Sequence, residues 1–175
     1  MHLTDRLLEH DVWLTHRIIH AASRLDDTQL DHPVDDTHEP QPWEAIEPSV
    51  RAMLDRLVKT KEMWAAAIAG RPYCGNPDHT LGGFERRADE GGAEFSKLVR
   101  EIRDRGDRDT AFVDALCDPP ETFTFGGIVA HVLTFNAARR EQLISALGTF
   151  GIDDIGYGDP FEWERTVIGD PGSKR

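Results

Sequence analysis

The chain has no long hydrophobic run. None of its apolar stretches approaches the roughly 20 residues that a membrane-spanning helix needs. Its first residues, Met1 to Arg6, lead directly into an amphipathic pattern, without the apolar segment and small-residue cleavage site of a secretory signal. The sequence therefore predicts a soluble protein that does not span a membrane and that is cytoplasmic.

Cysteines are also scarce, and basic residues are outnumbered by acidic ones. Cys74 and Cys117 form no Cys-x-x-Cys pair, which indicates reduced thiols rather than a disulfide framework. The 20 lysines and arginines are outnumbered by 32 aspartates and glutamates, so the net charge is −12. Nucleic acids and anionic membranes attract basic faces, so this charge argues against both partners. Nucleophile-elbow and phosphate-loop motifs are absent as well.

What the sequence does contain is four amphipathic segments with helical periodicity. The first covers residues 4–25, the second begins near Pro48-Ser49 and ends at Gly70, the third covers about 84–105, and the fourth runs from Thr124 to about 147. Thr4 and Thr124 are the expected N-terminal caps of the first and fourth helices. With no convincing strand pattern between the segments, we predict an all-α fold with four helices around a shared core.

Three long connections separate these helices. Residues 26–47 and 71–83 are rich in turn-forming residues, and 107–122 contains at most a short helical turn at Phe112 to Leu116. Connections in simple bundles usually have about two to eight residues, so these lengths predict a crossover connection or a pocket mouth. Residues 1–150 form one predicted helical domain. Residues 151–175 form a tail that packs on the bundle and frays at its end.

Three stretches together resemble the DinB/YfiT-like superfamily, over roughly residues 3–150. They are Leu-Leu-Glu-His-Asp-Val-Trp at 7–13, the second-helix stretch at 49–64, and Thr-Phe-Thr-Phe-Gly-Gly at 122–127 followed by His-Val-Leu at 131–133 and Arg-Arg-Glu-Gln at 139–142. The resemblance implies an up-down-down-up four-helix bundle, often a homodimer. It also implies a divalent metal, with activity as a hydrolase or as a transferase or isomerase that uses a low-molecular-weight thiol.

The residues that would hold this metal are replaced. The family usually ligates it with one histidine of the second helix and two histidines one turn apart on the fourth. Those positions correspond here to Arg56, Phe135 and Arg139, none of which is a metal ligand. His131 precedes Phe135 by one turn, but one imidazole does not hold a metal. We therefore predict neither a metal nor another cofactor.

The alternative is a zinc, nickel or iron enzyme with a different set of ligands. Its metal would be held by His131, Asp11, His10 or loop histidines in another arrangement. Such a protein would be a metal-dependent hydrolase or a thiol-dependent transferase. The residues do not decide whether the chain is an enzyme.

Periodicity gives a sharper hypothesis, independent of the family. The inner positions of the first helix are 3, 7, 11, 14 and 18, which places Asp11 inside. Lys61 is expected inside on the second helix, whose predicted inner positions are 50, 54, 57, 61, 64 and 68. Arg139 is expected inside on the fourth, whose predicted inner positions are 128, 132, 135, 139, 143 and 146. A buried charge is costly unless it is paired or solvated, so these side chains should meet.

We therefore expect Asp11 to pair with Arg139 or Lys61, with His131 and Arg56 at the margin. The surplus of cationic groups in this central cavity would suit a small anionic molecule, a carboxylate or a phosphate. The alternative is an internal ion pair that only fixes helix register, with Lys61 free to reach the surface on its apolar stem.

Other candidate sites carry a weaker signal. His16 and His20 lie one turn apart, a spacing that can chelate metal, but they fall on the face opposite the core and favour a surface or dimer contact. Cys74, Asp78 and His79 could assemble a loop site, although such a spacing is often accidental. A third class of function, an interaction module that uses the acidic surface to bind a basic partner, also remains open.

Overall fold

Four long helices dominate the computed structural model, which describes residues 1–34, 49–114 and 119–169. They are α1 (Leu3–Ala22), α3 (Val50–Ile68), α4 (Leu81–Arg105) and α5 (Phe125–Thr149). The shorter elements are α2 (Asp27–Leu30), the 3-10 turn η1 (Asp107–Asp109), the strands β1 (Ala111–Asp114) and β2 (Glu121–Thr124), α6 (Pro160–Trp163) and the π-helical turn η2 (Glu164–Ile168). The prediction of an all-α fold is confirmed, and the small sheet is an addition to it.

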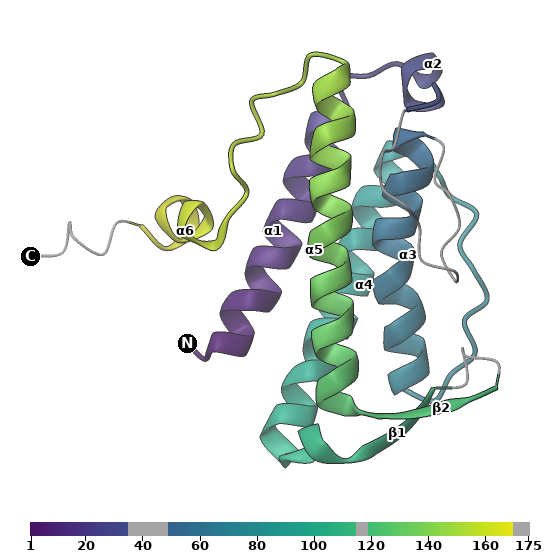
Figure 1. Ribbon diagram of the computed structural model, residues 1–175, viewed down its shortest axis with the longest axis vertical. Helices are drawn as coiled ribbons and strands as arrows, with labels where there is room; N and C mark the ends of the chain where they lie inside the picture. Colours follow the sequence, from purple (N-terminus) through teal and green to yellow (C-terminus); the bar gives the residue numbers. More distant parts are fainter. Residues whose placement is uncertain (35–48, 115–118, 170–175) are drawn as a thin grey trace, which may run out of the picture.

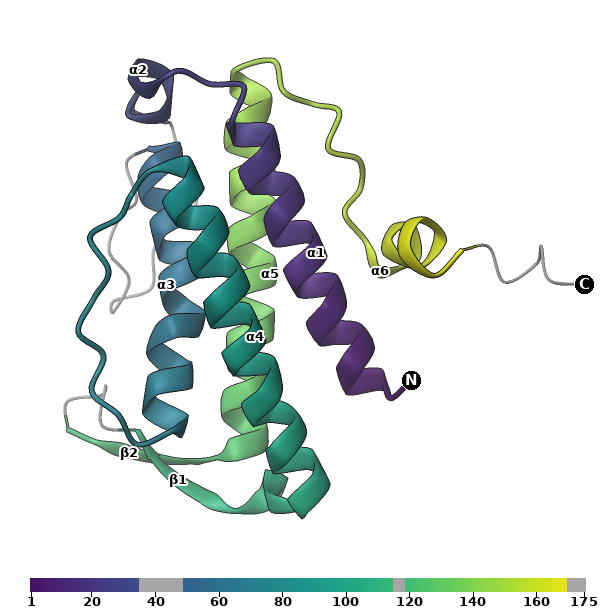
Figure 2. The ribbon, with the colours of Figure 1, turned by 180° about the vertical axis from the view of Figure 1, so that it is seen from behind.

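The long helices lie side by side, and α1 and α3 each pack between α4 and α5. Figures 1 and 2 show the path of the chain through this arrangement. It ascends α1, turns at α2 and descends α3. It then returns along the outside of the helices to the end near α2, where α4 begins, and descends α4. Helices α3 and α4 therefore run in the same direction, and α5 ascends again. Because α4 and α5 both separate α1 from α3, a contact between α1 and α3 must cross the centre.

The helices begin where side chains satisfy their free N–H groups. Thr124 Oγ1 accepts a hydrogen bond from Gly127 N at 3.0 Å, as the sequence predicted for the start of α5. Thr80 caps α4 in the same way. The prediction for Thr4 is wrong, because α1 starts one residue earlier and its N-cap, His2, makes no side-chain capping bond.

A small sheet at one end of the molecule occupies a segment in which the sequence showed no convincing strand pattern. Residues 112–114, for which the sequence allowed at most a short helical turn, belong instead to β1, which pairs antiparallel with β2 and brings Phe112 opposite Phe123. Pairing between two segments supplies backbone hydrogen bonds that a local reading of either segment cannot reveal. The rest of that predicted turn, Ala115 and Leu116, lies outside the described residues, as do Cys117 and most of the connection at 26–47.

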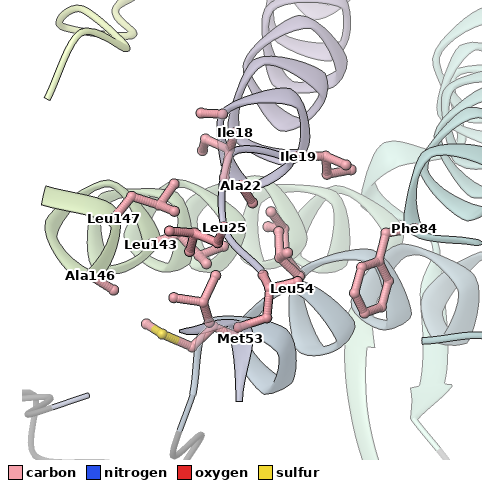
Figure 3. Close-up of a cluster of buried hydrophobic side chains, with 14 of the residues drawn as sticks. Ile18, Ile19, Ala22, Leu25, Met53, Leu54, Phe84, Leu143, Ala146 and Leu147 are labelled. Atoms are coloured by element: carbon pink, nitrogen blue, oxygen red, sulfur yellow. The ribbon is translucent and has the colours of Figure 1, made fainter. Parts of the chain in front are cut away.

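The hydrophobic core forms two clusters along the helices. The larger, drawn in Figure 3, fills the end near α2 with side chains from all four long helices, among them Ile18, Leu54, Phe84 and Leu143. The smaller lies toward the sheet and contains Leu8, Ala65, Phe95, Val99, Ile128 and Val132. One correction concerns α1, where Leu3 and Leu7, predicted to face inward, are 71% and 41% exposed, and Leu8 is buried.

Among the helices that the structure describes, none is both long enough and apolar enough to cross a membrane.

Candidate functional site

A layer of polar side chains separates the two hydrophobic clusters. On α1, Asp11 lies between Leu8 of the smaller cluster and Leu14 of the larger one. Lys61 on α3 is placed in the same way between Val58 and Ala65, and Asn136 and Arg140 on α5 between Val132 and Leu143. All four polar side chains are buried, with residue exposures of 0 to 3%. We call Asp11, Lys61, Asn136 and Arg140 the polar layer.

Asp11 is the anionic centre of this layer. Lys61 Nζ forms an ion pair with its Oδ2, and Arg140 Nη1 donates a hydrogen bond to its Oδ1. Burial opposes ionisation of the carboxyl group, but the charges and hydrogen bonds of Lys61 and Arg140 outweigh burial, so the pKa of Asp11 is lowered. The carboxylate therefore stays ionised in the core and joins α1, α3 and α5.

The polar layer is not fully satisfied. Within the described residues, the Asn136 side-chain oxygen and nitrogen and Arg140 Nε have no hydrogen-bond partner. No second carboxylate of the described residues pairs with Lys61 or Arg140, so two cationic groups share one anion. A buried polar group without a partner costs about 1–3 kcal/mol, and each such group in a folded protein requires an explanation. A buried water could partner both the donors and the amide oxygen, whereas a small anion would accept from the two donors, Arg140 Nε–H and the Asn136 NH₂ group.

Helix α4 contributes two glycines at the level of this layer. Gly91 and Gly92 are buried between Ala88 of the larger cluster and Phe95 of the smaller one. A Cβ at Gly91 would lie 3.3 Å from Glu62 Cγ, and one at Gly92 would lie 3.1 Å from Val12 Cγ2. The glycines, which weaken the helix locally, therefore permit close packing of α4 against α3 and α1.

The structure brings together two of the five predicted site residues, Asp11 and Lys61. The prediction for Arg139 is off by one position, because Arg140 occupies the interior and Arg139 is half-buried beside it. The guanidinium of Arg139 lies over the ring of Phe135, 5.3 Å from its centroid. The positions of α5 that face the interior are 128, 132, 136, 140 and 143, whereas the sequence had predicted 128, 132, 135, 139 and 143.

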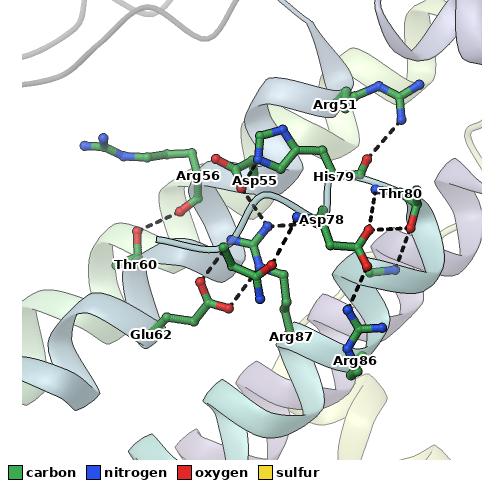
Figure 4. A network of polar contacts seen from close by, with 12 residues as sticks. Arg51, Asp55, Arg56, Thr60, Glu62, Asp78, His79, Thr80, Arg86 and Arg87 are labelled. Carbon is green, nitrogen blue, oxygen red and sulfur yellow. Dashed lines mark hydrogen bonds and ion pairs between the residues drawn. The ribbon is translucent and has the colours of Figure 1, made fainter. Parts of the chain in front are cut away.

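His131 and Arg56 lie elsewhere. The His131 ring makes an edge contact with Trp64 at 5.7 Å between centroids and a tilted contact with Phe135 at 4.3 Å, so it belongs to an aromatic group on α3 and α5. Arg56 is half-buried on α3, and its carbonyl accepts a hydrogen bond from Thr60 at 2.8 Å. In Figure 4 its guanidinium points away from the neighbouring Arg87 network.

That network was missed by the sequence reasoning. Arg87 on α4 is buried, and its Nε and Nη2 donate to the two carboxylate oxygens of Glu62, each at 2.9 Å, while Nη1 donates to Asp55 at 2.8 Å (Figure 4). Tyr73 donates to Glu62 at 2.9 Å, and burial together with that carboxylate raises the pKa of Tyr73 to about 12. The sequence did contain a sign of this network. Arg87 follows the apolar Phe84 by three residues, a spacing that places both side chains on the same, inward face of a helix. Arg87 has two carboxylate partners, in contrast to the cations of the polar layer.

The weaker candidates remain separate from the polar layer. His16 Nε2 lies 3.0 Å from Asp89 on α4, and His20 is exposed beside it on α1. Cys74 is exposed, Asp78 accepts from Thr80 and Arg86, and His79 lies 3.6 Å from Asp55. Among residues 1–34, 49–114 and 119–169, no group of three or more His, Cys, Asp or Glu side chains could hold a metal ion.

The metal that the resemblance implies therefore does not fit the residues present. The family's ligand positions carry two guanidinium groups and a phenyl ring, and the cations of the polar layer would repel a metal ion. In comparisons with known proteins, no family model, curated protein or solved structure matches this chain.

Proposed function

We propose that this chain is a divergent DinB/YfiT-like four-helix bundle that binds a small anionic molecule at its polar layer in place of a metal. The order of the helices and the parallel course of α3 and α4 support the proposed fold relationship. The charges of the layer support the ligand class, because two cations face a single carboxylate.

The observation that carries the proposal is the set of unpartnered atoms on α5. Arg140 Nε–H and the Asn136 amide are one helical turn apart, and both side chains are buried. An anion that accepts from Arg140 Nε and from the Asn136 amide would satisfy these donors and balance the excess positive charge at once. The buried setting favours a monovalent anion of a few atoms, such as formate or nitrate, over a large ligand.

The test is thermal unfolding of the full chain in a series of sodium salts at fixed ionic strength. An anion present at tenfold excess over its dissociation constant stabilises the protein by about 1.4 kcal/mol, which raises Tm by about 3–5 °C. We expect such a rise for formate or nitrate, growing with the logarithm of the anion concentration once that concentration exceeds the dissociation constant. Arg139→Gln should retain the rise, and Arg140→Gln should lose it.

Because Arg140→Gln also breaks an ion pair, Asn136→Leu provides a second test that leaves Asp11, Lys61 and Arg140 in place. We expect this variant to lose the anion effect and, without added anion, to be at least as stable as the parent, since it removes two unpartnered polar atoms. Anion-independent stability in the parent chain would contradict the proposal and leave the alternative of an internal ion pair that fixes helix register.

A further inference from the structure

The segment after α5 descends alongside α1 and brings α6 into contact with it (Figures 1 and 2). Ile155 is its last residue in the larger core cluster. Beyond Ile155, the described residues bury one large hydrophobic side chain, Trp163, which is 2% exposed. We call residues 156–168 the strap. One aromatic anchor therefore holds the strap by hydrophobic contact, while the bundle beneath it has two clusters.

Charged and polar contacts hold the rest of the strap on α1. Arg17 Nη1 lies 2.5 Å from Glu162 Oε1, and Arg6 Nη1 lies 2.7 Å from Glu164 Oε1. The His10 ring nitrogen Nε2 lies 2.7 Å from the carbonyl oxygen of Gly158. The four side chains in the two ion pairs are 19 to 39% exposed, so the pairs are individually weak and are screened by salt.

The strap nevertheless has a defined seat. Gly156 and Gly158 have φ angles of +85° and +65°, a backbone conformation that residues other than glycine rarely adopt. A Cβ at Gly158 would lie 2.9 Å from Leu14 Cδ1, so the strap backbone lies directly against α1. Within the strap, Gly158 N donates to Glu162 Oε2 at 2.9 Å. The strap therefore fits closely against α1, although few strong interactions hold it there.

The covered surface of α1 is basic and aromatic. Arg6, His10, Trp13 and Arg17 follow one another at steps of three or four residues, which places them on one face of the helix. The Arg17 guanidinium lies over the Trp13 ring, 4.8 Å from its centroid. A groove of about 520 Å³ continues along this helix past His20 and Arg24, beside Ile155. The strap complements this face in charge, because Glu162 and Glu164 pair with Arg17 and Arg6, and these two glutamates flank the buried Trp163.

We infer that this face of α1 is a docking surface for acidic peptide segments that carry an aromatic residue, and that the strap is its releasable occupant. The strap opens while the bundle stays folded, because its contacts are few and salt-sensitive whereas the long helices share a core. Opening exposes the basic face to an acidic segment of a partner protein.

Hydrogen exchange of the full chain at about 0.05 M and about 1 M salt tests the release. We expect strap amides such as that of Gly158 to exchange about tenfold faster at the higher salt concentration, while buried amides of α1 and α3 keep their rates. Strap amides that exchange only with global unfolding at both salt concentrations would overturn the inference.

Peptide binding in trans tests the docking surface. Trp163→Ala in the full chain should free the strap, and a synthetic peptide of residues 156–168 should then bind saturably, at least tenfold more weakly at high salt. Phe161→Ala is the matched control: Phe161 is 70% exposed, so this variant keeps its own strap in place and excludes the peptide. If Trp163→Ala does not fold, Glu162→Lys releases the strap without touching a core residue. Equal binding by the control, or no binding by a folded variant with a freed strap, would refute the docking surface.

Discussion

Arg140 Nη1 donates a hydrogen bond to Asp11 Oδ1, although 129 positions separate the two residues in the sequence. Lys61 pairs with the other oxygen of the same carboxylate. One buried aspartate thus fastens α1 to α5 and, across the centre of the molecule, to α3. The consequences of this arrangement can be measured.

Replacing Asp11 leaves two buried cations without their anion. We expect Asp11→Asn to lower the free energy of unfolding by about 3–5 kcal/mol, measured by urea denaturation, because an uncompensated buried charge is strongly destabilising. Asp109→Asn is the matched control. Asp109 pairs with Arg108 at the surface, where both side chains are at least 79% exposed, so its loss should stay within about 0.5 kcal/mol. Equal losses in the two variants would show that Asp11 is not buried as described.

The contribution of Asp11 should depend on pH in one direction. Its pKa is lowered from the ordinary value of 3.8, so the folded state favours the carboxylate. The stabilisation is therefore fully present above about pH 3.8 and is lost as the pH falls through the lowered pKa. The stability difference between the parent chain and Asp11→Asn should be constant from pH 7 to about 5 and shrink in stronger acid. A difference that already disappears above pH 5 would contradict the lowered pKa.

Asp78 offers a direct titration. The hydroxyl of Thr80, Arg86 and the Thr80 backbone N–H stabilise its carboxylate and lower its pKa to about 2. Carbon NMR at pH 3 should therefore find Asp78 still ionised. Because the Thr80 hydroxyl is the largest cause, Thr80→Val should raise this pKa more than Arg86→Gln does. The reverse order would show that the arginine, rather than the hydroxyl, holds the carboxylate.

The glycines of α4 should differ in their response to alanine. Gly82 has open space where a Cβ would lie, so Gly82→Ala should stabilise the helix by about 0.5–1 kcal/mol. At Gly92 the new Cβ would press on Val12, and we expect Gly92→Ala to be at least about 0.5 kcal/mol less favourable than Gly82→Ala. Equal effects in urea denaturation would exclude close packing between α4 and α1.

Much of the helical arrangement could be predicted from periodicity, because apolar residues recur at helical spacing in all four segments. The same reasoning found Asp11 and Lys61, since each interrupts an otherwise apolar face. It failed on α5, where an apolar choice at Phe135 led to Arg139, whereas the interior holds the polar pair Asn136 and Arg140. Steps of three and four residues are equally helical, and sequence alone favours the apolar option.

Two further features depend on tertiary contacts. Leu7 and Leu8 are adjacent and equally apolar, so only the packing of α1 determines which one is buried. The strands at 111–114 and 121–124 exist because they pair with each other, and neither segment has a strong strand pattern alone. Unpartnered atoms such as Arg140 Nε are likewise visible only once the neighbours are in place.

The most direct test of the anion site is the NMR signal of Arg140 Nε–H, assigned by comparison with Arg140→Gln and followed while formate or nitrate replaces a bulky anion at constant ionic strength. Binding at the polar layer predicts a saturable shift of this signal that persists in Arg139→Gln and disappears in Asn136→Leu. A signal that stays in place throughout the titration would contradict an anion site in the core.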